Sequence, residues 1–511
     1  MVYGFLAAFA GVGNSSPRPD SSNSKTGKIM VGITAYGAYF PRLRLQKQVI
    51  ADANAWFDSG LAGLAKGEKA MCNWDEDAVT MATEAYADCM GRAPGQTPAA
   101  LYLASTSLPF ADRQHSVIVA EALNLKTEDM RTMDVTSSQR AATSALLSAL
   151  DVAAAGHGDA VVVASEHRHT KCSSREEMLY GDGAAAIAVG KDNVIAELVC
   201  SFTQATDMVD HYRAEGAVAD YGWEERWVRD VGYMGILRRA VQGLLSKAGV
   251  EASAIKHFIL PTDQGRVPGA VAKRLGIADE AVADNLLQSA GIAGAAQPLL
   301  LLAHRLEQAE SGDLILVSGF GQGCDALLFR ATDAIKASKP EMGVSGYLDN
   351  GVAEENYNKF QSFNDLLVKE LGKRSETDKT AFLSAMYRNR GLVNSFIGGQ
   401  CTECHTVQMP KHNYCVNPEC GAYNTQVDHP MAGARGQIAT WTADRLTFDF
   451  NPPAYFGLVK FDGGGRIMMD MTEVNPDTFD TGTEVTVHFR IKQIDSQRGF
   501  RKYFWKAKPV A

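Results

Sequence analysis

Short apolar runs alternate with helical patterns between Met30 and about Thr332. The runs AALYLAST (99–106) and DAVVVASE (159–166) are apolar and short, which is typical of strands buried on both faces. Between them lies QRAATSALLSALDVAAAG (139–156), whose small and apolar residues predict a buried helix. This alternation predicts βαβ units and a parallel-rich sheet that is covered by helices.

The same order of elements returns in the second half of this region. MGILRRAVQGLLSKAGV (234–250) has the pattern of an amphipathic helix, and IKHFILPT (255–262) that of a strand. GDLILVSGFGQG (312–323) and CDALLFRAT (324–332) follow as two further strands. Two similar halves within one region predict a duplicated α/β fold.

The rest of the chain has a different character. Residues 333–397 are charged and helical in pattern, which predicts a linker arm. From Gly398 the chain is β-rich, with five short strand patterns separated by turn residues, which predicts a small all-β barrel over 425–511. Residues 1–29 include a polar stretch rich in Pro and Ser, and we expect them to form a disordered extension.

Composition and charge narrow the class of protein. The chain has 511 residues, 46% of them hydrophobic and 21% charged, as in globular multidomain proteins. A net charge of -9 argues against a nucleic-acid partner held through phosphates. The sequence has no apolar run long enough to span a bilayer. Most of the nine cysteines are scattered, which suits a reducing compartment and predicts a cytoplasmic protein.

Four cysteines between the arm and the barrel form a metal-binding pattern. Cys401 and Cys404 are separated by two residues, and Cys415 and Cys420 by four. Four thiolates on two tight turns complete a tetrahedral zinc site with no open position. We therefore predict a zinc ribbon over residues 398–424, with the metal in a structural role.

Several motifs resemble hydroxymethylglutaryl-CoA (HMG-CoA) synthases of the thiolase superfamily. They are VGITAYGAYFPRLRL (31–45), GEKAMCNWDEDAVTMATEA (67–85), DVTSSQRAATSALLSAL (134–150) and SGFGQGCDALLF (318–329). The resemblance implies a five-layered thiolase-like fold over 30–332, an acyl-CoA substrate and a homodimer. The C-terminal segment is similar to zinc-ribbon/OB-fold proteins that accompany thiolases, and this implies an acyl-CoA-associated OB barrel.

The catalytic residue types of that family are missing at the matching positions. The family places a cysteine nucleophile at the start of a buried helix, where the helix dipole lowers the thiol pKa. Counted from Asp134, that position holds Gln139, and a slip of one residue gives Ser138. The family histidine would fall at 261–263, the asparagine at 291–292 and the glutamate at 105–107, and none of these residues is of the family's type.

Three interpretations of the altered site remain open. In the first, Gln139 at the helix N-terminus stabilises an oxyanion, and His211, oriented by Asp210, acts as a base in carbon–carbon bond cleavage or acyl transfer without an acyl-enzyme. The substrate would then be a β-keto or β-hydroxy acyl-CoA. In the second, Cys324 in the glycine-rich segment is a relocated nucleophile. In the third, the chain is a non-catalytic scaffold or acyl-CoA-binding partner of a separate thiolase.

Further candidates concern CoA and a second metal. By the resemblance, Arg266, Lys273 and Arg274 are expected to contact the phosphates or pantetheine of CoA, and Gly321 is expected to allow close backbone approach to the active centre. His167 and His169 form a spaced pair after a predicted buried strand. Such a pair suits a metal, but the sequence offers no obvious third ligand.

Overall fold

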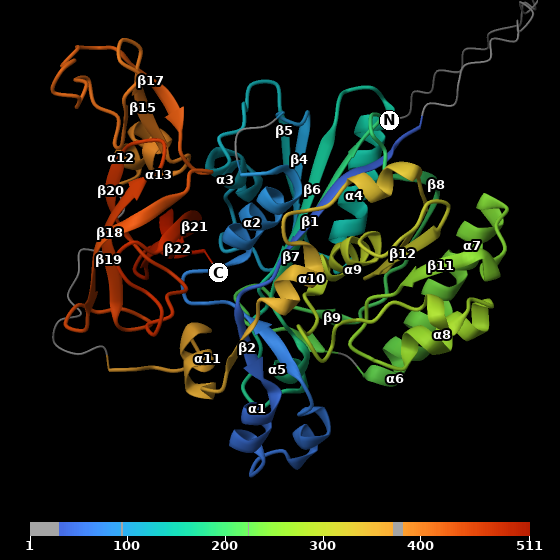
Figure 1. The fold of residues 1–511 in the computed structure, drawn as a ribbon. Coiled ribbons are helices and arrows are strands. Elements are labelled where there is room, and N and C mark those ends of the chain that lie inside the picture. Colours follow the sequence, from blue (N-terminus) through green and yellow to red (C-terminus); the bar gives the residue numbers. More distant parts are fainter. Residues whose placement is uncertain (1–29, 93–95, 223, 371–381, 511) are drawn as a thin grey trace, which may run out of the picture.

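The structure is a computed structural model that describes residues 30–92, 96–222, 224–370 and 382–510 (Figure 1). The expected N-terminal extension, 1–29, lies outside the described residues. Among the described helices, none combines the length and the apolarity that a membrane span requires.

The first half of the α/β region contributes five strands of one mixed sheet, in the order β1-β7-β6-β4-β5. Strand β4 pairs in parallel with both β5 and β6, as the βαβ pattern predicts, whereas β7 runs antiparallel to β1 and β6. Every residue of β6 and β7 is buried. The bounds are β1 (Gly32–Tyr39), β4 (Ala100–Ala104), β5 (Arg131–Val135), β6 (Ala160–Glu166) and β7 (Gly183–Gly190).

The second half contributes four strands in the order β11-β12-β13-β8. In the described part of the chain the two halves pair as strands where Gly32 and Ile33 of β1 meet Glu197 and Ala196 of β8. The short junction lets the two parts of the sheet face each other across a helical layer. The bounds are β8 (Ala196–Ala205), β11 (Ile255–Ile259), β12 (Leu314–Phe320) and β13 (Gly323–Ala331).

Helices form three layers around these two parts of the sheet. Helices α4 (Ala141–Ala154) and α9 (Gln297–Leu306) contact strands of both halves, so they form the middle layer. Helices α2 (Ala78–Met90) and α3 (His115–Ala122) cover the outer face of the first half. The outer face of the second half is covered by α7 (Arg238–Ala248), with α8 (Val267–Leu275) beside it. The predicted five-layered fold is confirmed.

The remaining elements are short. The segment expected to be a helical arm is not purely helical, because β14 (Val352–Glu354) in it pairs with β2 (Leu43–Gln46), which also pairs with β3 (Glu68–Met71). Short helices elsewhere are α1 (Lys47–Asn54), α5 (Arg175–Leu179), α6 (Glu225–Trp227), a π-helix (Val228–Leu237), α10 (Gly343–Asp349), α11 (Tyr357–Phe363), α12 (Leu383–Arg388) and α13 (Arg390–Val393). Two two-residue strands, β9 (His211–Tyr212) and β10 (Tyr221–Gly222), pair with each other.

The C-terminal part is the predicted ribbon and barrel, orange and red in Figure 1. The ribbon sheet consists of β15 (Ile397–Cys401), β16 (Val407–Gln408) and β17 (Gln426–Pro430). The barrel is an antiparallel sheet of five strands in the order β20-β19-β18-β21-β22, which matches the five predicted strands. Their bounds are β18 (Gly436–Asp444), β19 (Ala454–Phe461), β20 (Arg466–Asp470), β21 (Glu484–Asp495) and β22 (Phe500–Pro509).

Buried ion pairs attach the barrel to the α/β region. Arg490 of β21 is fully buried and lies 3.3 Å from a carboxylate oxygen of Glu84 in α2. Lys506 of β22 lies 2.8 Å from Asp75, just before α2. Because breaking a buried pair leaves an unpaired charge, these contacts hold the two parts firmly together.

Candidate active site

The N-terminus of α4 carries Gln139, the first of the candidate catalytic residues. Gln139 and Arg140 directly precede α4, and Ser137 has a left-handed backbone with φ of 70°. The turn after β12 lies against this point. A Cβ atom on Gly321 would lie 2.8 Å from the Ser138 hydroxyl and 3.0 Å from the Gln139 nitrogen. Only glycine leaves room for this approach, which agrees with the role expected for Gly321.

The side chain of Gln139 contacts the predicted base. Its Nε2 lies 3.2 Å from Nε2 of His211, and Nδ1 of His211 lies 3.0 Å from Oδ2 of Asp210. An amide nitrogen can only donate, so Nε2 of His211 accepts and Nδ1 carries the proton that bonds to Asp210. The three residues are therefore brought together as expected, with the basic lone pair of the imidazole facing the site.

A buried carboxylate stands behind Gln139, and the sequence reasoning did not identify it. Glu166, at the end of β6, accepts hydrogen bonds from the hydroxyl groups of Ser105 (3.0 Å) and Thr106 (2.9 Å) and from the Thr106 amide. Thr106 in turn accepts a long 3.4 Å bond from Nε2 of Gln139. Burial raises the pKa of Glu166. Residues 105–107 include no acidic side chain, but the fold brings the carboxyl group of Glu166 to Ser105 and Thr106.

A buried ion pair holds the segment that carries His211. Nε of Arg168 donates to Asp220 at 3.0 Å, and Arg213 pairs with the same carboxylate at 3.1 Å. Arg213 also donates to the carbonyl oxygen of Thr106. These contacts fix 210–220 over the ends of β4 and β6, which is what places the imidazole at Gln139. The sequence offered one signal for these residues, because polar side chains directly follow the buried strands β4 and β6.

Two other candidate nucleophiles are placed unfavourably. The Ser138 hydroxyl donates to the carbonyl oxygen of Gly321 at 2.9 Å, and it has no basic partner among its described contacts. Cys324 is fully buried in the cluster beneath α7, and burial raises the pKa of its thiol. Its neighbour Asp325 points to the opposite face of β13 and accepts hydrogen bonds from Thr143 and Ser144 of α4. The Cys324 thiol therefore points away from Gln139.

A pocket of about 380 Å³ lies beside α6 and the start of α8. Its lining includes five basic side chains, Lys47, Lys66, Arg175, Arg229 and Arg266. It also includes the acidic residues Glu225 and Asp263, both of which pair with Arg175. Of the three expected CoA contacts, only Arg266 lines it. Lys273 and Arg274 lie in the last turn of α8, away from this lining.

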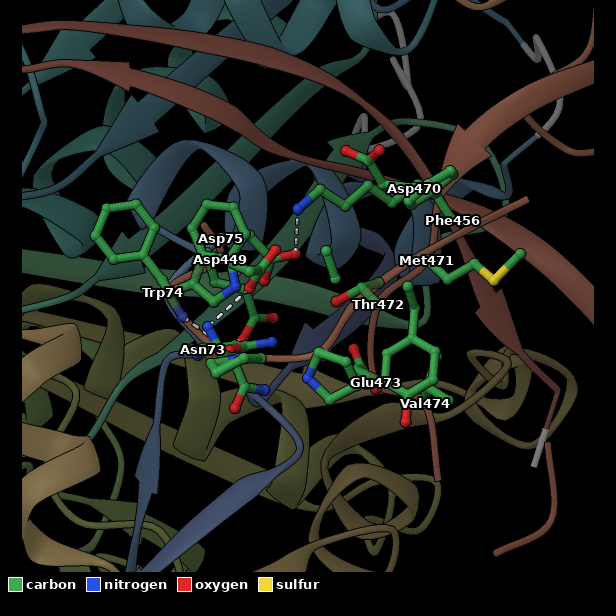
Figure 2. Close-up of a pocket in the computed structure, with 18 of the residues that line it drawn as sticks. Asn73, Trp74, Asp75, Asp449, Phe456, Asp470, Met471, Thr472, Glu473 and Val474 are labelled. Carbon is green, nitrogen blue, oxygen red and sulfur yellow. Dashed lines mark hydrogen bonds and ion pairs between the residues drawn. The ribbon is translucent and has the colours of Figure 1, made fainter. Parts of the chain in front are cut away.

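A larger cavity of about 1060 Å³ lies between the barrel and the α/β region. Figure 2 shows Asn73, Trp74 and Asp75 on one side of it and Thr472, Glu473 and Val474 on the other. Trp74 stacks on Phe450 with ring centroids 5.0 Å apart. Neither Gln139, His211 nor Glu166 lines this cavity, so it is separate from the candidate active site.

The four predicted zinc ligands converge. Cys401, Cys404, Cys415 and Cys420 bring their sulfur atoms within 4.8 Å of one another, and two pairs lie 3.5 and 3.9 Å apart. Cys401 and Cys415 are buried, and the other two are partly exposed. Four thiols in this arrangement fit a tetrahedral zinc ion.

Comparison with known proteins agrees with this architecture. The family of 3-oxoacyl-[acyl-carrier-protein] synthase III C-terminal domains matches residues 245–330, and the ChsH2 C-terminal OB-fold domain matches residues 428–490. The hydroxymethylglutaryl-CoA synthase of Aeropyrum pernix is 32% identical over 328 residues, which cover 63% of this chain and 90% of that protein. The enzyme of the same name from Methanococcoides burtonii is 30% identical over 319 residues, which cover 60% of this chain and 90% of that protein.

Solved structures share the fold at lower identity. An HMG-CoA synthase complexed with CoA aligns with a TM-score of 0.53 and 17% identity, over 69% of this chain and 95% of that one. 3-Oxoacyl-(acyl carrier protein) synthase III of Pseudomonas aeruginosa aligns with a TM-score of 0.52 and 20% identity, over 61% of this chain and 99% of that one. The chain belongs to the hydroxymethylglutaryl-CoA synthase family of the thiolase superfamily, and an OB-fold domain is fused to its C-terminus.

Proposed function

We propose that this protein cleaves or forms a carbon–carbon bond in a β-keto or β-hydroxy acyl-CoA without an acyl-enzyme intermediate. The observation that carries the proposal is the contact between Gln139 and the His211–Asp210 pair at the N-terminus of α4. An acid–base group and an amide donor meet at the position that matches the family's nucleophile. A base and an oxyanion donor suffice for aldol-type chemistry on a β-hydroxy acyl-CoA, whereas Claisen-type cleavage of a β-keto acyl-CoA also needs water or free CoA to take the acyl group.

The contacts suggest how the two groups act in turn on a β-hydroxy acyl thioester. Nε2 of His211 takes the hydroxyl proton, the bond between the α and β carbons breaks, and the electron pair moves onto the thioester enolate. The protonated imidazole is stabilised by Asp210 and can no longer accept a bond from Gln139. One amide hydrogen of Gln139 is then free to donate to the enolate oxygen. The imidazolium returns its proton to the α carbon.

CoA binding is supported by the basic pocket and by the relatives. Related HMG-CoA synthases are described in complex with CoA and with 3-hydroxy-3-methylglutaryl coenzyme A. In this chain Arg266 and its basic neighbours around the pocket supply the charges that a pyrophosphate and a 3′-phosphate require.

The zinc ribbon and the sheet edge carry two further assignments. A closed set of four thiols leaves no position for substrate, so the zinc at Cys401, Cys404, Cys415 and Cys420 has a structural role. Strand β5 is at the edge of the large sheet, and Met133 on it is 38% exposed. An unpaired edge of this kind suits pairing with a second copy, so we expect a homodimer, to be checked by sedimentation.

Turnover of CoA thioesters tests the proposal. The full chain is incubated with a panel of β-hydroxy and β-keto acyl-CoA thioesters, and the products are followed by mass spectrometry. From a β-hydroxy acyl-CoA we expect a shorter acyl-CoA and a carbonyl compound, and from a β-keto acyl-CoA a shorter acyl-CoA together with an acid or, when free CoA is added, a second acyl-CoA. No acyl adduct should appear in the intact mass of the protein. Gln139→Ala and His211→Asn are each expected to lower kcat by about 10²-fold or more, as the loss of an oxyanion donor or a general base does.

A second histidine–aspartate pair provides the matched control. His257 of β11 pairs with Asp313 at 3.2 Å, outside the candidate site. His257→Asn should therefore leave kcat within about twofold, as for substitutions away from the chemistry. Equal losses in His211→Asn and His257→Asn would contradict the assigned base. The absence of turnover across the whole panel would favour the scaffold interpretation over an enzyme.

A further inference from the structure

A second group of metal-ligating side chains lies beneath the candidate active site. Cys72 follows β3, His167 follows β6 and Asp182 precedes β7. All three residues are buried. Cys72 is distant in the sequence from His167 and Asp182, and all three are separate from the zinc ribbon in both sequence and location.

The carboxylate of Asp182 connects the other two residues. Its Oδ1 lies 3.0 Å from Nδ1 of His167, and its Oδ2 accepts from the backbone nitrogen of Cys72 at 2.7 Å. The potential ligand atoms of the three residues all lie within 4.8 Å of one another. Zinc bonds of about 2.0 to 2.3 Å place tetrahedral ligand atoms roughly 3.5 Å apart, so side-chain shifts of about 1 Å would close the set.

A fourth donor stands next to this group. The ring of His169 lies edge-on to that of His167, with centroids 4.9 Å apart. Nδ1 of His169 is buried and has no hydrogen-bond partner within the described part of the chain. A buried polar atom without a partner is costly unless something binds it.

We propose that Cys72, His167, Asp182 and His169 form a second metal site that holds a zinc-class divalent cation. Sulfur, imidazole nitrogen and carboxylate oxygen are the donor types that zinc takes in proteins. Coordination replaces the S–H bond of Cys72 by a sulfur–metal bond and releases one proton to solvent. A thiolate and a carboxylate then balance the two charges of the ion, which lowers the free-energy cost of burying it.

A metal at this position would fix residues that hold the candidate active site. His167 is flanked by Glu166, which holds Thr106, and by Arg168, which pairs with Asp220. A metal bound at His167 would join the ends of β3 and β6 to the start of β7 and fix both neighbours. The four ligands are therefore positioning residues, not groups that touch the substrate.

Metal counting on the full chain tests the proposal independently of turnover. The protein is saturated with Zn²⁺, freed of loosely bound ion by gel filtration and analysed by inductively coupled plasma mass spectrometry. We expect two zinc ions per chain. Asp182→Asn, which keeps the size of the side chain, should retain one, and so should the ribbon variant Cys404→Ser. The double variant should retain none.

Three further variants make the count decisive. Cys72→Ser and His169→Asn remove ligands independently of Asp182, and each is expected to reduce the count to one. Cys172→Ser removes an exposed thiol that belongs to neither cluster and should retain two. Circular dichroism confirms that each variant is folded. In Cys404→Ser, bound Co²⁺ should show a sulfur-to-metal absorption band as intense as one thiolate produces, not four.

The opposite outcome is equally clear. A single zinc ion in the saturated wild-type chain that disappears in Cys404→Ser would overturn the second site. A count of two that persists in folded Asp182→Asn and Cys72→Ser would overturn it as well. Either result would leave the group as a hydrogen-bonded histidine–aspartate pair, and neither would bear on the role proposed for Gln139.

Discussion

The amide of Gln139 stands at the start of α4, and an amide and a thiol respond differently to a helix N-terminus. The positive end of the helix dipole stabilises a thiolate and makes it nucleophilic. A neutral amide gains little from the same field. Gln139 instead donates hydrogen bonds to His211 and Thr106. The Gln139 side chain is therefore placed to act through hydrogen bonds.

The buried thiol of Cys324 gives a prediction at the residue scale. Because burial raises its pKa and the side chain faces the core, we expect iodoacetamide to leave Cys324 unmodified in the folded protein while it alkylates the exposed Cys172. Peptide mass spectrometry measures both. Cys324→Ala should leave kcat within about twofold and lower the free energy of unfolding by about 1–2 kcal/mol. An acyl adduct on Cys324 after turnover would contradict the placement.

The turn between β12 and β13 shows how two elements define the site together. Gly319 lies against Thr143 of α4, and Gly321 lies against Ser138 and the Gln139 nitrogen. The turn supports the start of α4 from below, while the segment with His211 approaches Gln139 from the other side. The geometry at Gln139 therefore depends on this turn as much as on the helix.

A single methyl group tests that dependence at the element scale. In Gly321→Ala the new Cβ would lie 3.0 Å from the Gln139 nitrogen and 3.1 Å from the Arg140 nitrogen, so the turn and helix must separate. We expect a loss of about 1–3 kcal/mol in the free energy of unfolding, measured with urea, together with reduced kcat. The control is Gly269→Ala in α8, where nothing lies within 4 Å of the new Cβ. There the helix should gain about 0.5–1 kcal/mol. Equal stability in the two variants would count against the close approach.

At the scale of the whole molecule, buried charges join the barrel to the α/β region. Arg490 contacts Glu473 at 3.1 Å as well as Glu84. Burial alone raises the pKa of Glu473, but the charges of Lys508 and Arg490 lower it to about 2. The ordinary pKa of a glutamate carboxyl is 4.5. When the pH falls below that value, Glu473 binds a proton in the unfolded chain but not yet in the folded protein. The contribution of Glu473 to stability is therefore complete above about pH 4.5 and is lost as the pH falls toward 2.

Glu473→Gln tests this linkage. At pH 7 the variant should unfold about 3 kcal/mol more easily than the wild type, because Lys508 loses its carboxylate partner and Arg490 keeps only Glu76 and Glu84 of its three. The difference should shrink between pH 5 and pH 3, and urea unfolding at several pH values measures it. Asp470→Asn is the control, because its pair with Lys492 is partly exposed and is worth about 1 kcal/mol or less. A difference that is constant with pH would contradict the lowered pKa.

The sequence alone was sufficient for the features that depend on local pattern. Apolar runs of strand length predicted the alternation of strands and helices along the chain, and turn-separated strands predicted the five-stranded barrel. The spacing of Cys401, Cys404, Cys415 and Cys420 predicted the thiol cluster because its ligands lie on two short turns of one chain segment. The motif that begins at Asp134 placed Gln139 at the start of its helix. Each of these features is determined by residues that are close in sequence.

The tertiary structure decided which distant residues meet. It brought His211 to Gln139, Glu166 to Thr106, and Cys72 and Asp182 to His167, across 110 residues between Cys72 and Asp182. It also turned Cys324 into the core, because alternate residues of β13 face opposite sides. Such meetings depend on strand register and on the packing of layers, and long-range packing leaves no periodic signal in a single sequence. Features formed by residues close in sequence could therefore be predicted from the sequence, whereas the grouping of acid, base and metal ligands depends on the tertiary fold.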